Sequence, residues 1–62
     1  MFIEIITKSN ETIYLNVDKI LYVFKTKKDN TLIVDVDGNE FSLREEYSNF
    51  VKRLEQLKFK NV

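Results

Sequence analysis

The chain contains few side chains that could do chemistry. It has no histidine and no cysteine among its 62 residues, which excludes disulfides and the usual zinc ligand sets. Acid–base or nucleophilic chemistry would have to use Asp, Glu, Lys, Ser, Thr or Tyr. The sequence must therefore be searched for carboxylates and lysines at a useful spacing.

Asp35 and Asp37 are the best-spaced carboxylates. Two positions apart on a strand they would point to the same face, where they could share a metal ion or a proton. The simpler interpretation is a solvated strand end that runs into an Asp37-Gly38 turn. A chain this short has little room for a cleft that excludes water. We therefore predict that the protein is not an enzyme and has no catalytic residues, metal site or cofactor.

Three lysines, Lys25, Lys27 and Lys28, gather beside Phe24 near the tip of a predicted hairpin. A basic ribbon with an aromatic ring can follow a phosphate backbone and stack a base, so nucleic-acid binding through this hairpin is the alternative function. Lysines also mark where a strand leaves the core, and they discourage edge-to-edge pairing. Ten basic residues balance ten acidic ones, which argues against nucleic acid as the partner.

The length predicts one small domain over residues 1–62. Chains of this size are near the limit at which a core alone stabilises the fold, and many add a disulfide, a metal or a partner. Only efficient packing or self-association remains here, so a homodimer is one expected form.

We expect a cytoplasmic protein without membrane insertion. Every apolar run is far too short to span a bilayer. The segment from Met1 to Ile6 has no basic start and contains Glu4 within its apolar run, unlike a signal peptide. The many Lys, Asn and Ile residues are typical of low-GC bacteria and their phages.

Segments rich in β-branched and aromatic residues predict about five strands. The segment 20–27 is expected to be the central strand, and Asn16 to Asp18 a turn or a single helical turn. Polar turns are expected at residues 8–11 and 28–30 and at Asp37-Gly38. The other strands are expected at 2–7, 12–15, 31–36 and 39–43.

From Arg44 onward the apolar period becomes helical. Ser42 and Glu45 fit a capping box, which predicts that the helix begins directly after Ser42. The sequence therefore predicts an α+β fold, an antiparallel β-meander of about five strands with one C-terminal helix packed on one face. The apolar stripe of this helix consists of Tyr47, Phe50, Val51, Leu54 and Leu57.

A two-residue turn at Asp37-Gly38 would decide which side chains share a face of the sheet. A turn at Gly38-Asn39 would shift the register by two residues and leave the two faces unchanged. On this register the helix is expected to cover an aliphatic face made of Leu21, Val23, Leu32, Val34, Val36, Phe41 and Leu43. The opposite face is aromatic and contains Tyr22, Phe24, Ile33, Asp35 and Glu40, and Tyr14 is expected to join it.

The aromatic face has two explanations, because one helix can cover only one side of a small sheet. A strongly curled sheet could close on itself and bury the face. Alternatively, the face could bind another protein or a second copy of the chain. The second explanation is the leading hypothesis, a small non-enzymatic protein-interaction module. Its predicted partner-binding residues are Tyr14, Tyr22, Phe24 and Ile33.

Residues 10–20 resemble the small FlbD/SwrD-like bacterial proteins, which have a turn followed by Ile/Phe-Tyr-Leu/Val-Asn-Pro-Asp-x-Ile. Asn16, Asp18 and Ile20 match this run, and Val17 stands where the family usually has Pro. Residues 31–39 resemble the family's strand and turn, and residues 41–54 its final strand and helix. The resemblance implies a non-enzymatic protein associated with swarming motility and flagellar operons. A short stretch, residues 19–23, also resembles one strand of the much longer LytTR-type DNA-binding domains. Only this stretch matches, and we interpret it as convergence on a common buried-strand sequence.

Overall fold

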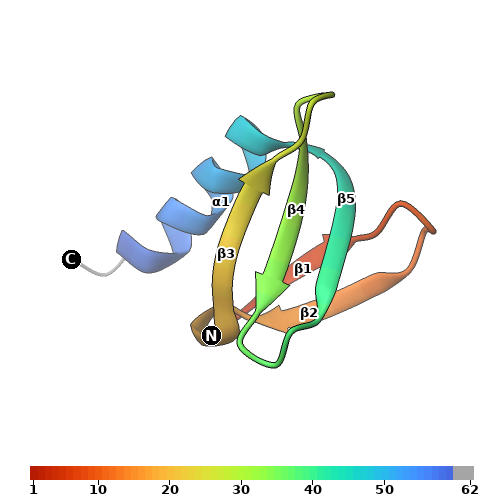
Figure 1. The fold of residues 1–62 in the computed structure, drawn as a ribbon. Helices are drawn as coiled ribbons and strands as arrows, with labels where there is room; N and C mark the ends of the chain where they lie inside the picture. Colours follow the sequence, from red (N-terminus) through yellow and green to blue (C-terminus); the bar gives the residue numbers. More distant parts are fainter. Residues whose placement is uncertain (60–62) are drawn as a thin grey trace.

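The computed structural model describes the backbone of residues 1–59 and the side chains as far as Leu57. It contains five antiparallel strands in two sheets, one 3₁₀ turn and one C-terminal helix (Figure 1). The predicted α+β architecture is confirmed. The elements are β1 (Phe2–Ile6), β2 (Thr12–Asn16), the 3₁₀ turn (Val17–Lys19), β3 (Ile20–Lys25), β4 (Asn30–Asp35), β5 (Glu40–Glu46) and α1 (Tyr47–Phe59).

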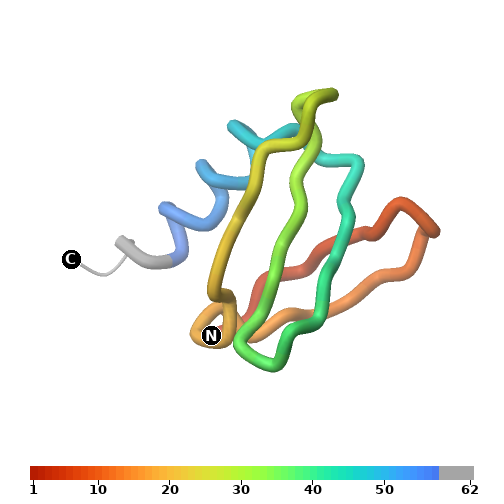
Figure 2. The backbone as a smooth tube through the Cα atoms, viewed as in Figure 1, coloured from red at the N-terminus to blue at the C-terminus, as the bar shows by residue number. Residues whose placement is uncertain are grey.

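The molecule has two layers. Strands β3, β4 and β5 form one sheet with β4 in the middle, and both α1 and the β1–β2 hairpin lie behind this sheet in the view of Figures 1 and 2. The two sheets meet where Thr7 bridges Leu43 and the Lys8 N–H donates to the Ser42 carbonyl at 2.9 Å. The buried core between the layers consists of Ile3, Ile5, Leu15, Val17, Ile33, Leu43 and Phe50.

All three hairpins have a three-residue loop of the same construction. The last loop residue has a positive φ of 65° at Asn10, 64° at Asp29 and 84° at Gly38. Asn, Asp and Gly are the residues that adopt this left-handed conformation most readily. The N–H of this last loop residue donates to the carbonyl three residues earlier, at 2.9 Å for Asn10, 3.0 Å for Asp29 and 3.1 Å for Gly38. This pattern is a type I turn followed by a left-handed residue.

A side chain holds each of these loops at its start. The Thr7 hydroxyl accepts a hydrogen bond from the Glu11 N–H at 3.1 Å, and the Thr26 hydroxyl accepts one from the Asn30 N–H at 3.1 Å. Asp35 has the same role in the third loop, which is described below. Short polar side chains commonly bond nearby backbone groups in this way. The repeated spacing of an acceptor followed three residues later by Asn, Asp or Gly therefore specifies the loop length.

The predicted two-residue turn at Asp37-Gly38 is wrong, because that loop has three residues. With three-residue loops, the residue numbers of two paired positions are both odd or both even. Ile33 therefore pairs with both Val23 and Phe41. A one-residue change of register exchanges the two faces of a strand. Strand β4 is consequently turned over relative to the prediction.

The predicted aliphatic face is also wrong, because its members lie on both sides of the sheet. Leu32 and Val34 pair with Phe24 and Tyr22 and face outward with them. Leu21 is exposed at the β-bulge between Ile20 and Tyr22, and Val36 is exposed in the last loop. The inner face, against the core, carries Val23, Thr31, Ile33, Asp35, Phe41 and Leu43.

Helix α1 begins at Tyr47, five residues after Ser42, so the predicted capping box is wrong. Ser42 and Glu45 both belong to β5. The Tyr47 N–H instead donates to the Asp29 carbonyl at 2.9 Å, which ties the start of the helix to the β3–β4 loop. Of the predicted apolar stripe, Phe50 is fully buried and Leu54 and Leu57 pack against the core, while Tyr47 and Val51 are half-buried.

The Val17–Lys19 turn follows the predicted pattern. The Asn16 side chain accepts a hydrogen bond from the Asp18 N–H at 3.0 Å and so holds the single helical turn between β2 and β3. Within the described residues, none of the helices has the length and apolar content needed to cross a membrane.

Candidate protein-interaction surface

The outer face of the three-stranded sheet bears a contiguous apolar patch. We define the outer sheet surface as Tyr22 and Phe24 on β3 with their partners Val34 and Leu32 on β4. Tyr22 is 54% exposed and Phe24 is 47% exposed, while Leu32 and Val34 are half-buried. Over residues 1–59 no element lies in front of this face (Figure 1).

The two aromatic rings of this surface contact each other. Their centroids are 5.7 Å apart and their planes are inclined by 39°, and this centroid distance is within the range of aromatic pairs in contact. Each ring also has an aliphatic neighbour across the strand pair, since directly opposite residues on one face are within side-chain reach. The four side chains therefore form one patch and not four separate exposed residues.

The structure brings together only part of the predicted partner-binding set. Tyr22 and Phe24 are adjacent, as expected. Ile33 is fully buried at 0% exposure on the opposite face, because the three-residue loops turn β4 over, so it cannot contact a partner. Leu32 and Val34 occupy the place expected for Ile33. The sequence could have predicted the outward position of Leu32 and Val34, because Thr26 followed three residues later by Asp29 indicates a three-residue loop.

Tyr14 is exposed but lies on a different surface. It belongs to β2, where it pairs with Glu4 of β1 in the second sheet. A hydrogen bond and the negative charge of Glu4 raise the pKa of the Tyr14 phenol. Tyr14 is therefore not part of the outer sheet surface, although its exposure of 69% leaves it available for contact.

The lysines of the β3–β4 hairpin do not form a ribbon with Phe24. Lys25 alternates with Phe24 along β3 and so points to the other side of the sheet. Its Nζ atom lies 3.4 Å from the Asp29 carboxylate, with both side chains largely exposed. Lys27 and Lys28 are exposed in the loop itself. The hairpin tip is therefore basic, but a carboxylate already offsets part of its charge.

Asp35 is buried and has a structural role. Its Oδ1 accepts hydrogen bonds from the N–H groups of Asp37 at 3.0 Å and Asn39 at 2.8 Å, and its Oδ2 accepts one from the Asn39 side chain at 3.0 Å. The hydrogen bonds from Asn39 and, to a lesser extent, from Asp37 hold the pKa of Asp35 below its ordinary value. Asp37 meets Asp35 through its backbone N–H and is itself exposed, so the two aspartates do not form a paired carboxylate site.

The described part of the chain contains no group of three or more Asp or Glu side chains placed to hold a metal ion. Acidic residues instead serve local contacts such as those of Asp35 and Glu45.

No protein-family model, curated protein or solved structure matches the chain. The resemblance to the FlbD/SwrD-like proteins consequently stays an expectation from the sequence. What the protein does must be inferred from the chemistry of its surfaces.

Proposed function

We propose that the protein is a non-enzymatic module that binds another protein, or a second copy of itself, through the outer sheet surface. The observation that supports this is the contact between two half-exposed aromatic rings, Tyr22 and Phe24, beside Leu32 and Val34 on one uncovered face. Contiguous exposed apolar patches commonly mark interaction sites. Aromatic residues are also enriched at the centre of protein interfaces.

The fold does not require these side chains in its core. The buried cluster lies on the inner side of the sheet and is closed by Phe50 from α1 and by Ile3 and Ile5 from β1. Apolar area left in water costs about 25 cal/mol per Å² compared with burial. A partner that covers Tyr22 and Phe24 would recover this free energy, and an aromatic anchor of this kind contributes about 2 kcal/mol or more to binding.

Nucleic-acid binding through Lys25, Lys27 and Lys28 stays the alternative, but the structure provides less support for it. The aromatic ring it would use for base stacking, Phe24, points to the other side of the sheet from Lys25. The resemblance of the sequence to the FlbD/SwrD-like proteins would be consistent with a protein partner connected with motility.

The test compares association by the wild type with that of a Tyr22→Ser, Phe24→Ser double variant. Tyr14→Ser is the control, because Tyr14 is even more exposed than Tyr22 and Phe24 but lies on the other sheet. We expect the double variant to keep a cooperative thermal transition. It should lose the self-association that light scattering detects in the wild type, or the binding of the protein partner that the wild type captures. Equal association by all three proteins would contradict the proposal.

A further inference from the structure

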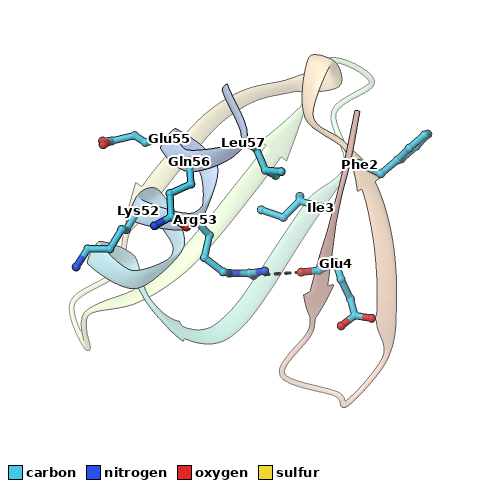
Figure 3. Close-up of a pocket in the computed structure, with 8 residues that line it drawn as sticks. All are labelled: Phe2, Ile3, Glu4, Lys52, Arg53, Glu55, Gln56 and Leu57. Atoms are coloured by element: carbon cyan, nitrogen blue, oxygen red, sulfur yellow. Dashed lines mark hydrogen bonds between the residues drawn. The ribbon is translucent and has the colours of Figure 1, made fainter. Parts of the chain in front are cut away.

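A concave surface lies between β1 and α1, away from the outer sheet surface. It is an open groove of about 780 Å³. Phe2, Ile3 and Glu4 line it on the strand side, and Lys52, Arg53 and Leu57 are among the helix residues on the other side. Figure 3 shows Ile3 and Leu57 pointing into the space between strand and helix. The groove therefore has an apolar floor.

The strand wall of this groove is a free sheet edge. Thr7 donates to the Glu11 carbonyl and Val17 donates to the Met1 carbonyl, both at 2.9 Å. The odd-numbered residues of β1 thus bond with β2. In an antiparallel pair these bonded positions alternate with positions whose N–H and C=O groups point away. The backbone groups of Phe2 and Glu4 consequently point toward the groove.

Contacts on the helix side support this assignment. Arg53 donates to the Glu4 backbone carbonyl at 3.1 Å (Figure 3), which places that carbonyl on the groove side of β1. Along Phe2–Ile6 the strand pairs only with β2, and among the described residues β5 reaches its other edge just beyond, at Thr7 and Lys8. The N–H groups of Phe2 and Glu4 and the Phe2 carbonyl are left to be paired.

Arg53 also holds the helix wall in place. Its guanidinium lies 2.7 Å from the Glu45 carboxylate and 5.6 Å from the centre of the Phe50 ring. The charge of Arg53 is thereby paired with a residue of β5. Because these contacts fix the helix relative to both sheets, the groove is a preformed feature.

The remaining charges on the helix wall have opposite signs. Lys52 and Glu55 both line the groove, and among the described side chains neither takes part in an ion pair, since those pairs are Lys25–Asp29 and Arg53–Glu45. They are three residues apart, which is about one helical turn. Figure 3 shows both side chains pointing away from β1, so a strand bound at the β1 edge would not face them directly.

We propose that this groove binds an extended peptide segment of another protein, which adds as a strand to the free edge of β1. The peptide backbone would form hydrogen bonds with the N–H and C=O groups of Phe2 and with the N–H of Glu4. An apolar side chain of the peptide would pack on Ile3 and Leu57. Strand addition beside a helix wall is a recurring mode of peptide recognition. This site is independent of the outer sheet surface.

The test uses random-sequence peptides displayed on phage and selected on the wild-type protein. Glu4→Pro removes the N–H that faces the groove without removing a β1–β2 hydrogen bond, and proline is tolerated at such an edge position. Glu4→Ala is the matched control, because it removes the side chain and keeps the N–H. We expect selected peptides to bind the wild type and Glu4→Ala equally and to bind Glu4→Pro at least about tenfold more weakly.

Two further measurements keep the result interpretable. If Glu4→Pro lacks a cooperative thermal transition, N-methylation of the selected peptide at successive backbone nitrogens gives the test: we expect loss of affinity at every second position. The double variant of Tyr22 and Phe24 should bind these peptides as the wild type does. The proposal is overturned if no peptide is enriched in the selection, or if a second copy of the chain occupies the groove. It is also overturned if Glu4→Pro binds the selected peptides as tightly as the wild type, or if N-methylation lowers the affinity without alternating along the peptide.

Discussion

Arg53 of the helix and Glu45 of β5 form a two-pronged ion pair, with the Arg53 Nη2 and Nε atoms 2.7 and 2.9 Å from the two carboxylate oxygens of Glu45. Asn49 also donates to the Glu45 carboxylate. The same guanidinium reaches the Glu4 carbonyl of β1. One side chain thereby connects α1 to both sheets, and it lines the groove beside β1.

Replacement of Arg53 should therefore reduce stability through this pair. Because the pair is only partly buried, we expect Arg53→Met to lower the free energy of unfolding by about 1–2 kcal/mol. Arg53→Lys keeps the charge but cannot form the fork, so it should recover less than half of the loss. Urea unfolding measures both values, and an unchanged midpoint for Arg53→Met would contradict the role given to Arg53.

The orientation of β4 can be tested with two neighbouring residues. Ile33 is in the core and Val34 faces outward, so Ile33→Ala should cost about 2–5 kcal/mol and Val34→Ala less than about 1 kcal/mol. The register expected from the sequence predicts the reverse order. Chemical unfolding of the two variants distinguishes the registers directly.

The last hairpin loop requires a left-handed residue at position 38. No atom outside the neighbouring residues lies within 4 Å of a Cβ placed on Gly38, so a substitution there changes backbone conformational energy only. We expect Gly38→Val to lower the free energy of unfolding by about 1–2 kcal/mol. Gly38→Asn should cost much less, because Asn tolerates this conformation. Equal costs for Val and Asn would show that the loop adopts another geometry.

Acid should weaken the same loop through Asp35. Its pKa is lowered in the folded protein from the ordinary value of 3.8, so the folded state favours the ionised form. This contribution to stability is fully present above the unfolded pKa and is lost as the pH falls through the folded pKa. We expect the stability difference between the wild type and Asp35→Asn to be larger at about pH 6 than at about pH 3. A difference that does not change with pH would mean that the Asp35 charge contributes nothing.

The strands and the helix were predictable because their apolar periods differ. The alternation around Tyr22 and Phe24 and the helical spacing of Phe50, Leu54 and Leu57 are each long enough to identify their element. The register of the strands was not predictable, because Asp37-Gly38 locally favours a two-residue turn. The side chain of Asp35 instead bonds the backbone as far as Asn39 and produces a three-residue loop.

The start of the helix and the groove depend on contacts between distant segments. Ser42 and Glu45 have the spacing of a capping box, but strand pairing with β4 keeps both in β5. Glu45 then pairs with Arg53 of the helix. The groove requires β1 and α1 to lie behind the same sheet with a gap between them, and a residue pattern along one segment contains no information on that placement.

The central claim, that the outer sheet surface is the site of contact with a protein partner, is tested most directly by site-specific photocrosslinking in cells. A photoreactive phenylalanine derivative is placed in turn at Tyr22, Phe24 and Tyr14, which are all exposed aromatic positions. We predict a discrete protein adduct from positions 22 and 24 and none from position 14. An adduct from position 14 alone, or no adduct from positions 22 and 24, would contradict the claim.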